Sequence, residues 1–352
     1  MSQVSGLPLE IVLCIVDKLV DDPRCVLKPS HPTTKTLLSF TRVCRGTYTV
    51  ASNHLRKHCV YINSRLRLDQ LLYCIEATRG RTRSSVEDDD ARSLKPITAL
   101  YLAPFDRSTA NDAAIVHKIA TLFGRVHTTL TRLVINMPLH SIRSTYATGG
   151  VRRTLREAFL ALTALEDLVS LRDELFLYTM EVGEEENEDI PEPEPWRAWP
   201  RLKRLALDKV NADENFWKAV RGTEALEQVV LTRADSLEEV CMKRAYLGLH
   251  REGELPRPLR VVLVNVSMMH PDQLAGESNW GQIDPSNLVD VVAYDVPVSF
   301  YGDESHPELC RAWVKAAALR DELWSWEGTP VGPRRVDMSA GEEGAQASEL
   351  YV

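Results

Sequence analysis

The sequence predicts an α/β protein in which a small helical unit precedes an irregular array of alternating strands and helices. Two observations support this prediction. Short apolar runs with the rhythm L-x-x-L-x-L recur along most of the chain, and segments with the three- and four-residue apolar spacing of helices separate them. With 352 residues, 44% of them hydrophobic, the chain is long enough for a full core in one large domain or in two or three smaller ones.

The N-terminal part is expected to contain three helices. The first is predicted over residues 8 to 20, with Pro8 in its first turn, where an amide would lack a helical partner in any case. Apolar side chains occupy more than one face of this helix, which is more than a short helix buries against its own chain. Two further helices are expected between Thr34 and Cys59, with Gly46 as the break between them.

Repeated apolar runs follow this helical part. They start at Ile97, Leu130, Leu202, Leu226, Leu259 and Leu288, and a degenerate copy starts at Leu165. The intervals are 33, 35, 37, 24, 33 and 29 residues, wider and less regular than the roughly 20 to 29 residues of ordinary leucine-rich repeats. Each run is expected to form a strand.

Helical segments with one apolar face lie between many of these runs. They cover residues 68–75, 115–126, 155–162 and 216–220. Strands that alternate with helices favour a parallel sheet, because parallel neighbours need a crossover connection. The repetition favours a curved, open solenoid, and an ordinary closed α/β domain is the alternative.

Two segments differ from the array. Residues 181–195 carry eight acidic residues and three prolines, so we expect a flexible acidic insertion. Ser305 and Glu308 have the spacing of a capping box and open an apolar helix, which is expected to cap the last layer of the array. The expected organisation is a helical domain (1–58), a repeat region (59–304), a capping helix (305–327) and a disordered tail (328–352).

Composition and motifs argue against several classes of protein. No apolar stretch approaches the roughly 18 residues of a membrane span, and no signal peptide is recognisable, so a cytoplasmic or nuclear protein is expected. The seven cysteines are scattered without a C-x-x-C pair, and His54, His58 and Cys59 have no second ligand pair at a suitable spacing for a metal. Phosphate-binding, nucleophile-elbow and zinc-protease motifs are absent, so neither an enzyme nor a cofactor is expected.

The N-terminal residues carry a resemblance to a known family. Leu7-Pro8-Leu9-Glu10-Ile11 with Ile15 and Leu19, then Leu37-Leu38-Ser39-Phe40, then Val43-Cys44-Arg45, follow the order of the F-box motif over roughly residues 5 to 55. The layout of an F-box before irregular strand–helix repeats also resembles fungal F-box proteins. The family's F-box is a three-helix unit that docks on the adaptor subunit of SCF-type cullin–RING ubiquitin ligases, while the following domain captures a protein substrate for ubiquitin-dependent degradation.

This resemblance implies a set of adaptor-binding residues: Leu7, Pro8, Ile11, Ile15, Leu19, Leu37, Leu38, Val43 and Cys44. The link from Asp21 to Thr33 is longer than is usual in the family, and Thr47 stands where the family often has a large residue. In the alternative interpretation of the surplus apolar residues, the three helices simply pack onto the first repeat.

The uneven distribution of charge along the chain leaves a second function open. The net charge is −8, yet residues 24–83 contain twelve Lys or Arg against two acids, so this segment sums to +10 and the remainder to −18. Such asymmetry also fits a nucleic-acid-associated or scaffold protein that uses the basic region 24–83.

Overall fold

A computed structural model describes residues 7–20, 22, 24–82, 96–105, 112–142, 150–179, 192–248, 257–298 and 304–331. Most of the acidic stretch (181–191) and of the expected tail (332–352) lie outside the described residues. The described chain is a mixed α/β protein with a nine-stranded, mostly parallel sheet that does not close on itself.

Three helices begin the described chain and pack around a small core of their own. They are α1 (Leu9–Asp17), α2 (Pro32–Phe40) and α3 (Arg45–His58). Val16, Leu37 and Ala51 are completely buried between them. The three predicted helices are confirmed, but α1 ends at Asp17 and the break between α2 and α3 falls before Gly46, which lies in the first turn of α3.

The sheet runs in chain order from one edge to the other. Its strands are β1 (Tyr61–Ile62), β2 (Ala99–Leu102), β3 (Arg132–Ile135), β4 (Asp167–Ser170), β5 (Arg204–Asp208), β6 (Gln228–Thr232), β7 (Leu259–Val266), β8 (Val289–Val296) and β9 (Thr329–Pro330). Every apolar run predicted as a strand forms one, including the degenerate copy at Leu165. All neighbours are parallel except β9, which pairs with β8 in the antiparallel direction.

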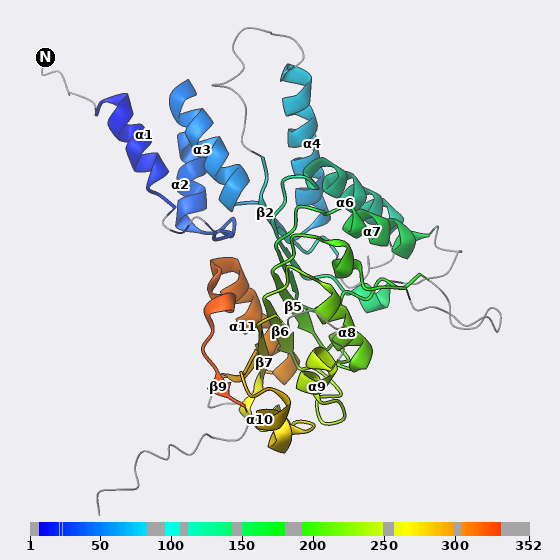
Figure 1. The fold of residues 1–352 in the computed structure, drawn as a ribbon. Coiled ribbons are helices and arrows are strands. Elements are labelled where there is room, and N and C mark those ends of the chain that lie inside the picture. The colour runs from blue at the N-terminus through cyan, green and yellow to red at the C-terminus, as the bar shows by residue number, and fades with distance from the viewer. Residues whose placement is uncertain are drawn as a thin grey trace, which may run out of the picture.

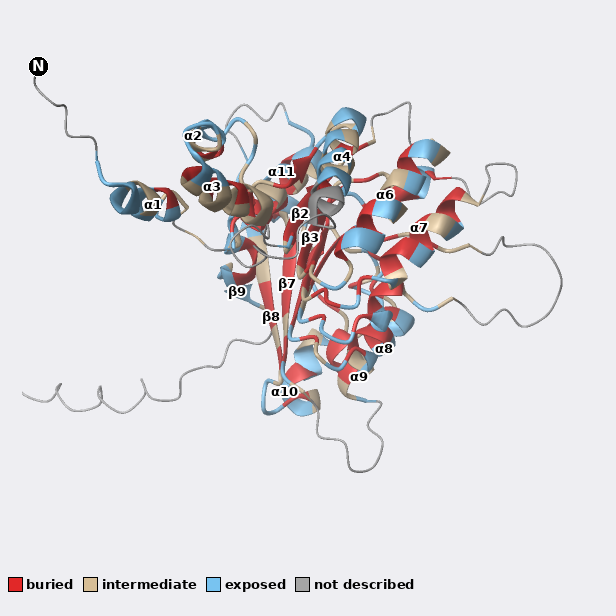
Figure 2. Ribbon diagram, turned by 90° about the horizontal axis from the view of Figure 1, so that it is seen from above, coloured by how far each residue is buried: buried red, intermediate tan, exposed pale blue. Residues whose placement is uncertain are grey.

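Crossover helices cover one face of the sheet (Figures 1 and 2). They are α4 (Arg65–Thr82), α6 (Ala113–Val126), α7 (Val151–Leu160), α8 (Glu214–Gly222), α9 (Met242–Leu247) and α10 (Trp280–Ile283). Alternate strand residues such as Leu133, Leu168 and Leu205 point into this layer, as the two-residue period of a strand requires. The four predicted helical segments correspond to α4, α6, α7 and α8.

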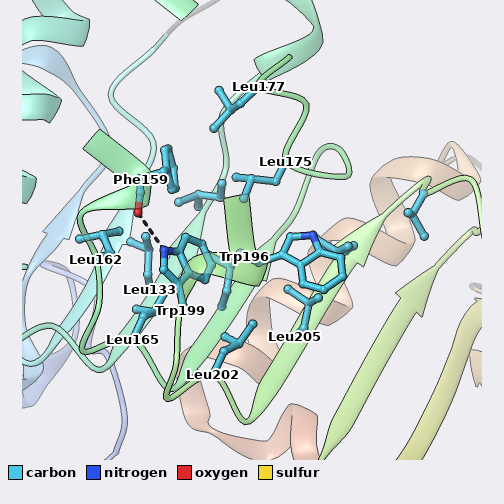
Figure 3. Packing of buried hydrophobic residues seen from close by; sticks show 14 of the residues in the cluster. Leu133, Phe159, Leu162, Leu165, Leu175, Leu177, Trp196, Trp199, Leu202 and Leu205 are labelled. Carbon is cyan, nitrogen blue, oxygen red and sulfur yellow. Dashed lines mark hydrogen bonds between the residues drawn. The ribbon is translucent and has the colours of Figure 1, made fainter. Parts of the chain in front are cut away.

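Tryptophans fill the layer where the acidic stretch rejoins the described chain. Trp196 lies in the short 3-10 helix η3 (Pro195–Ala198), and Trp199 follows it. Both indoles are buried among leucines from β3, β5 and the segments beside them (Figure 3). Trp199 Nε1 donates a hydrogen bond to the Phe159 carbonyl over 2.9 Å, so its one polar atom is satisfied. These two tryptophans therefore anchor the packing of this layer.

The C-terminal helix lies against the second face of the sheet, which corrects the prediction that it caps the end of the array. Helix α11 (His306–Arg320) buries Cys310, Val314 and Ala318 in a cluster that contains alternate residues of β1–β8. Figures 1 and 2 show α11 on the side of the sheet opposite α6–α9. The expected capping box does not form, because Ser305 makes no side-chain hydrogen bond to the helix.

A row of polar side chains crosses this second face at the amino ends of the strands. Its members occupy paired positions on five neighbouring strands: Arg132, Asp167, Arg204, Gln228 and Arg260. Asp167 is 2% exposed in its side chain, and each of its oxygens accepts a hydrogen bond of 2.5 Å from Arg204. We call these five residues the polar row.

The polar row holds the segment that follows α11. The chain turns at Asp321, whose φ of 63° is in the left-handed region, and continues as the 3-10 helix η6 (Glu322–Ser325). Arg132 donates to the Ala318 carbonyl, and Asp321 Oδ1 lies 3.4 Å from Arg132 Nη2. Farther along the row, Gln228 Nε2 donates to the carbonyl of Trp324 over 3.1 Å, and Arg260 Nη2 donates to that of Trp326 over 3.0 Å.

The link between α1 and α2 joins the same network. Arg24 Nη2 lies 2.5 Å from Asp167 Oδ2, and Arg24 Nε lies 2.9 Å from Asp321 Oδ2. Two residues later, the Val26 amide donates to the Leu319 carbonyl over 2.7 Å. The three-helix unit is therefore attached to the sheet through the C-terminal segment as well as through the direct connection from α3 to β1.

Replacing Asp167 by Ala should destabilise the protein strongly. The substitution leaves the largely buried Arg204 without the carboxylate that accepts two short hydrogen bonds from it, and breaking a buried ion pair from one side costs about 3–5 kcal/mol. Urea unfolding of Asp167→Ala should report this loss. The control is Asp290→Ala, which removes an exposed carboxylate 3.3 Å from Arg260 and should cost less than about 1 kcal/mol. Equal stability of the two variants would contradict the role assigned to Asp167.

Candidate interaction surface of the three-helix unit

The three-helix unit exposes more large apolar side chains than the rest of the described chain. Among the described residues thirteen such side chains are exposed, and seven of them belong to this unit: Leu7, Leu9, Ile11, Ile15, Leu38, Val43 and Tyr48. We call these seven residues the apolar surface. Scattered exposed apolar residues are normal on a monomer, but a concentration in one small unit is typical of a binding surface.

Helix α1 contributes the largest share of the apolar surface. Ile11 and Ile15 stand one helical turn apart with exposed fractions of 47% and 44%, while Val16, on another face, is completely buried. Asp17 Oδ1 lies 2.9 Å from His54 Nε2 and connects α1 to α3. The helix is thus fixed by one apolar face and one polar contact, and its other apolar face stays uncovered.

The corner between α2 and α3 is fixed by Thr47. This residue is completely buried, its Oγ1 donates to the Phe40 carbonyl over 2.9 Å, and it accepts the Cys44 amide over 3.2 Å. A small hydroxyl side chain is what these two contacts need. The corner then presents Val43 and Tyr48 outward, with exposed fractions of 65% and 46%.

The start of α1 lies against this corner at Gly46. A Cβ at Gly46 would lie 3.5 Å from Leu9 Cδ2 and 3.9 Å from Cys44 Sγ, so Leu9 lies directly over the first turn of α3. The contact joins the start of α1 to the Cys44 end of α3, and these two ends carry most of the apolar surface.

The nine residues expected to bind an adaptor differ in how far they are exposed in the structure. Seven of them are exposed: Leu7, Pro8, Ile11, Ile15, Leu38, Val43 and Cys44. Leu19 is half-buried against the core of the unit, and Leu37 is completely buried in it. The expectation for Leu37 is therefore wrong, because adjacent residues of a helix point about 100° apart and only Leu38 faces outward.

Two members of the apolar surface were missed by the sequence interpretation. Leu9 belongs to the LPLEI motif but is not among the residues expected to bind an adaptor. Tyr48 stands four residues after Cys44, at the spacing that brings two side chains onto one helical face. That spacing was the available signal for including Tyr48.

The residues considered for a metal site have other partners. His54 is paired with Asp17, and the buried His58 has its Nδ1 3.4 Å from the Cys25 carbonyl oxygen. Within the ranges that the structure describes, no three His, Cys, Asp or Glu side chains are grouped to hold a metal ion. None of the described helices is long and apolar enough to cross a membrane.

His58 ties the linker before α2 to the end of α3. Its backbone oxygen accepts the Leu27 amide over 2.6 Å, and its ring lies against Cys25. Burial lowers the pKa of His58 to about 4. The folded unit therefore holds the neutral imidazole.

The stability of the three-helix unit should fall as the pH is lowered through the range between 6.5 and 4. The unfolded chain protonates His58 with a pKa near 6.5, whereas the folded chain resists protonation down to about 4, so acid favours unfolding. At pH 5 this group should cost about 2 kcal/mol relative to pH 8. Urea unfolding of the wild type and of His58→Gln at both pH values checks this. An equal pH dependence in the two proteins would exclude His58 as the source.

The two adjacent leucines of α2 should respond differently to truncation. Leu37→Ala removes a completely buried side chain and should cost about 2–5 kcal/mol of unfolding free energy. Leu38→Ala removes a half-exposed side chain and should change the stability by less than about 1 kcal/mol. Thermal unfolding measures both. The reverse order would mean that α2 is rotated about its axis relative to this structure.

Comparison with known proteins adds no further assignment to this geometry. No protein-family model matches the chain, and no curated protein matches its sequence.

Proposed function

We propose that this chain is the substrate-recognition subunit of an SCF-type cullin–RING ubiquitin ligase. In this proposal the three-helix unit is an F-box that docks on the adaptor subunit, and the following leucine-rich-repeat-like region captures a protein substrate. The observation that carries the proposal is the concentration of exposed apolar side chains on the three-helix unit. Six of these seven residues stand at positions of the F-box-like motif.

The size of the apolar surface is adequate for a stable contact. Burying one large apolar side chain contributes roughly 1.5–3 kcal/mol, so four or five of the seven side chains offset the cost of association. The surface is formed by helices and by the turn between two of them, which suits a helical partner. A partner that covers it would account for the apolar residues that this chain leaves exposed.

The alternative in which the unit merely packs onto the first repeat has less support. The contacts between the unit and the described remainder of the chain use other residues, namely Arg24, Val26 and the connection from α3 to β1. The apolar surface is exposed even with these contacts in place. It therefore needs a different explanation.

The basic region 24–83 gives no support for nucleic-acid binding in the described chain. Arg24 is used in the network with Asp167 and Asp321, and Arg65 lies 3.0 Å from Asp112. The remaining described Lys and Arg residues of the region are distributed over the linker before α2, the turn after α2 and three separate helices. We therefore propose no second function from them.

Replacing Leu7 and Ile11 together by Ala should weaken binding to a purified SCF adaptor subunit by at least about tenfold. Each side chain contributes roughly 1.5 kcal/mol or more when it is buried, and about 1.4 kcal/mol corresponds to a factor of ten. The affinity should change little with salt, because the contact is apolar, whereas phosphate contacts weaken steeply as salt is raised. Calorimetric titration at two salt concentrations measures both properties.

The matched control changes two exposed apolar residues outside the unit. Met268 and Met269 have exposed fractions of 74% and 53%, and Met268→Ala with Met269→Ala should leave adaptor binding unchanged. Circular dichroism should show that both double variants keep the fold. A wild-type protein that never binds the adaptor, or a Leu7 and Ile11 variant that binds as well as wild type, would refute the proposal.

A further inference from the structure

A group of cations lies on the second face of the sheet, beside α11 and toward the carboxyl ends of the first strands. Arg311 and Lys315 stand one turn apart on α11, and Arg172 follows the end of β4. Arg172 is exposed, and the other two side chains are half-buried. We call these three residues the cationic patch.

The members of the cationic patch are held in place by neutral groups. Lys315 Nζ lies 4.5 Å from the ring centroid of Tyr101 and 5.7 Å from that of Tyr61, whose rings stack on each other. Arg311 Nε donates to the Leu171 carbonyl over 3.1 Å. On the neighbouring strand end, Arg172 Nε donates to Asn136 Oδ1 over 3.0 Å.

Among the described residues, no carboxylate forms an ion pair with the cationic patch. Asp208 acts on Arg311 from a distance, but its oxygens accept hydrogen bonds of 3.0 and 2.5 Å from Arg233. Glu308 acts on Arg311 in the same way without reaching ion-pair distance. Burial is the main cause that lowers the pKa of Arg311, and the charge of Arg172 lowers it further. The patch therefore carries positive charge that the described chain does not neutralise.

The patch spans neighbouring strands at this edge of the sheet. Lys315 lies over Tyr101 on β2, Arg172 reaches Asn136 after β3, and Arg311 reaches the Leu171 carbonyl after β4. Two steps between neighbouring strands span about 10 Å, which is the length of about three residues of an extended peptide. Successive acidic side chains along such a peptide can meet successive cations.

We infer that the cationic patch is the docking surface for an acidic peptide segment of a protein substrate. The inference depends on the proposed function only in calling the bound protein a substrate. Arg311 and Arg172 present guanidinium groups suited to carboxylates, and Lys315 adds a point charge that lies beside two tyrosine rings. Helix α11 thus supplies binding residues to the face that it partly covers.

The test measures binding of a fluorescent octaglutamate peptide by anisotropy, with octaglutamine as the uncharged counterpart. Wild type should bind the first and not the second. The triple variant Arg172→Gln, Arg311→Gln, Lys315→Gln should bind octaglutamate about five- to tenfold more weakly, because exposed ion pairs are individually weak. The matched control Arg153→Gln, Arg201→Gln, Arg244→Gln removes three exposed cations from elsewhere and should stay within twofold of wild type.

Several outcomes would overturn the inference. Wild type that does not bind octaglutamate, or equal losses in both triple variants, would exclude a specific patch. Tighter, patch-dependent binding of a single-stranded octathymidylate would assign the surface to nucleic acid. Binding that appears only after Glu184, Glu185, Glu186 and Glu188 are changed to Gln would make the chain's own acidic stretch the occupant.

Two further measurements keep the result interpretable. Should the triple variant melt at a lower temperature than wild type, the single variant Arg172→Glu replaces an exposed side chain and should still weaken octaglutamate binding about threefold. Adaptor binding by the triple variant should equal that of wild type. If the wild type does not bind the adaptor but does bind octaglutamate, the proposed function is refuted and the peptide site is not. If it binds the adaptor but not octaglutamate, the peptide site is refuted and the proposed function is not.

Discussion

The buried charge of Asp167 is the constraint on which the arrangement of this molecule depends. A carboxylate on a central strand with 2% of its side chain exposed is tolerable only when cations surround it, and Arg204 and Arg24 both lie 2.5 Å from it. Asp321 extends the network toward Arg132 and Arg24. These residues come from the linker of the helical unit, from three strands and from the turn after α11, so the network forms only when all of these elements are in place.

A consequence is that the helical unit is oriented by the far end of the chain. The Val26 amide and Arg24 side chain bind the turn at residues 319–321, which the polar row in turn holds against the sheet. A substrate receptor needs a fixed geometry between the surface that binds the ligase and the surface that binds the substrate. In the function proposed above, the network that joins the linker, the C-terminal segment and the sheet would hold these two surfaces in a fixed orientation.

The strands and crossover helices could be predicted from the sequence because each element buries one face, and the apolar residues of that face recur at a regular spacing. Leu133, Leu168 and Leu205 are each part of such a pattern.

The position of α11 could not be predicted, since its apolar face fits either the end of the array or the second sheet face. The same limit applied to the apolar surface: the motif identified the leucine pair, but only the packing of α2 decides that Leu37 is inward and Leu38 outward. The polar network was missed because its members come from separate parts of the sequence: Arg204 is 37 residues from Asp167, and Arg24 is 143 residues from it.

The position of α11 also determines where the second face can bind anything. The helix and the segment after it cover the middle of the sheet and the amino ends of its strands, through Val314, Ala318 and the contacts of the polar row. The part of this face that α11 leaves accessible to a partner lies beside the helix, at the carboxyl ends of the first strands. There α11 carries the half-buried Arg311 and Lys315, and the adjoining strand end carries the exposed Arg172. The element that removes most of this face from solvent therefore also sets the charge of the part that stays open, and that charge is opposite in sign to the net charge of the chain.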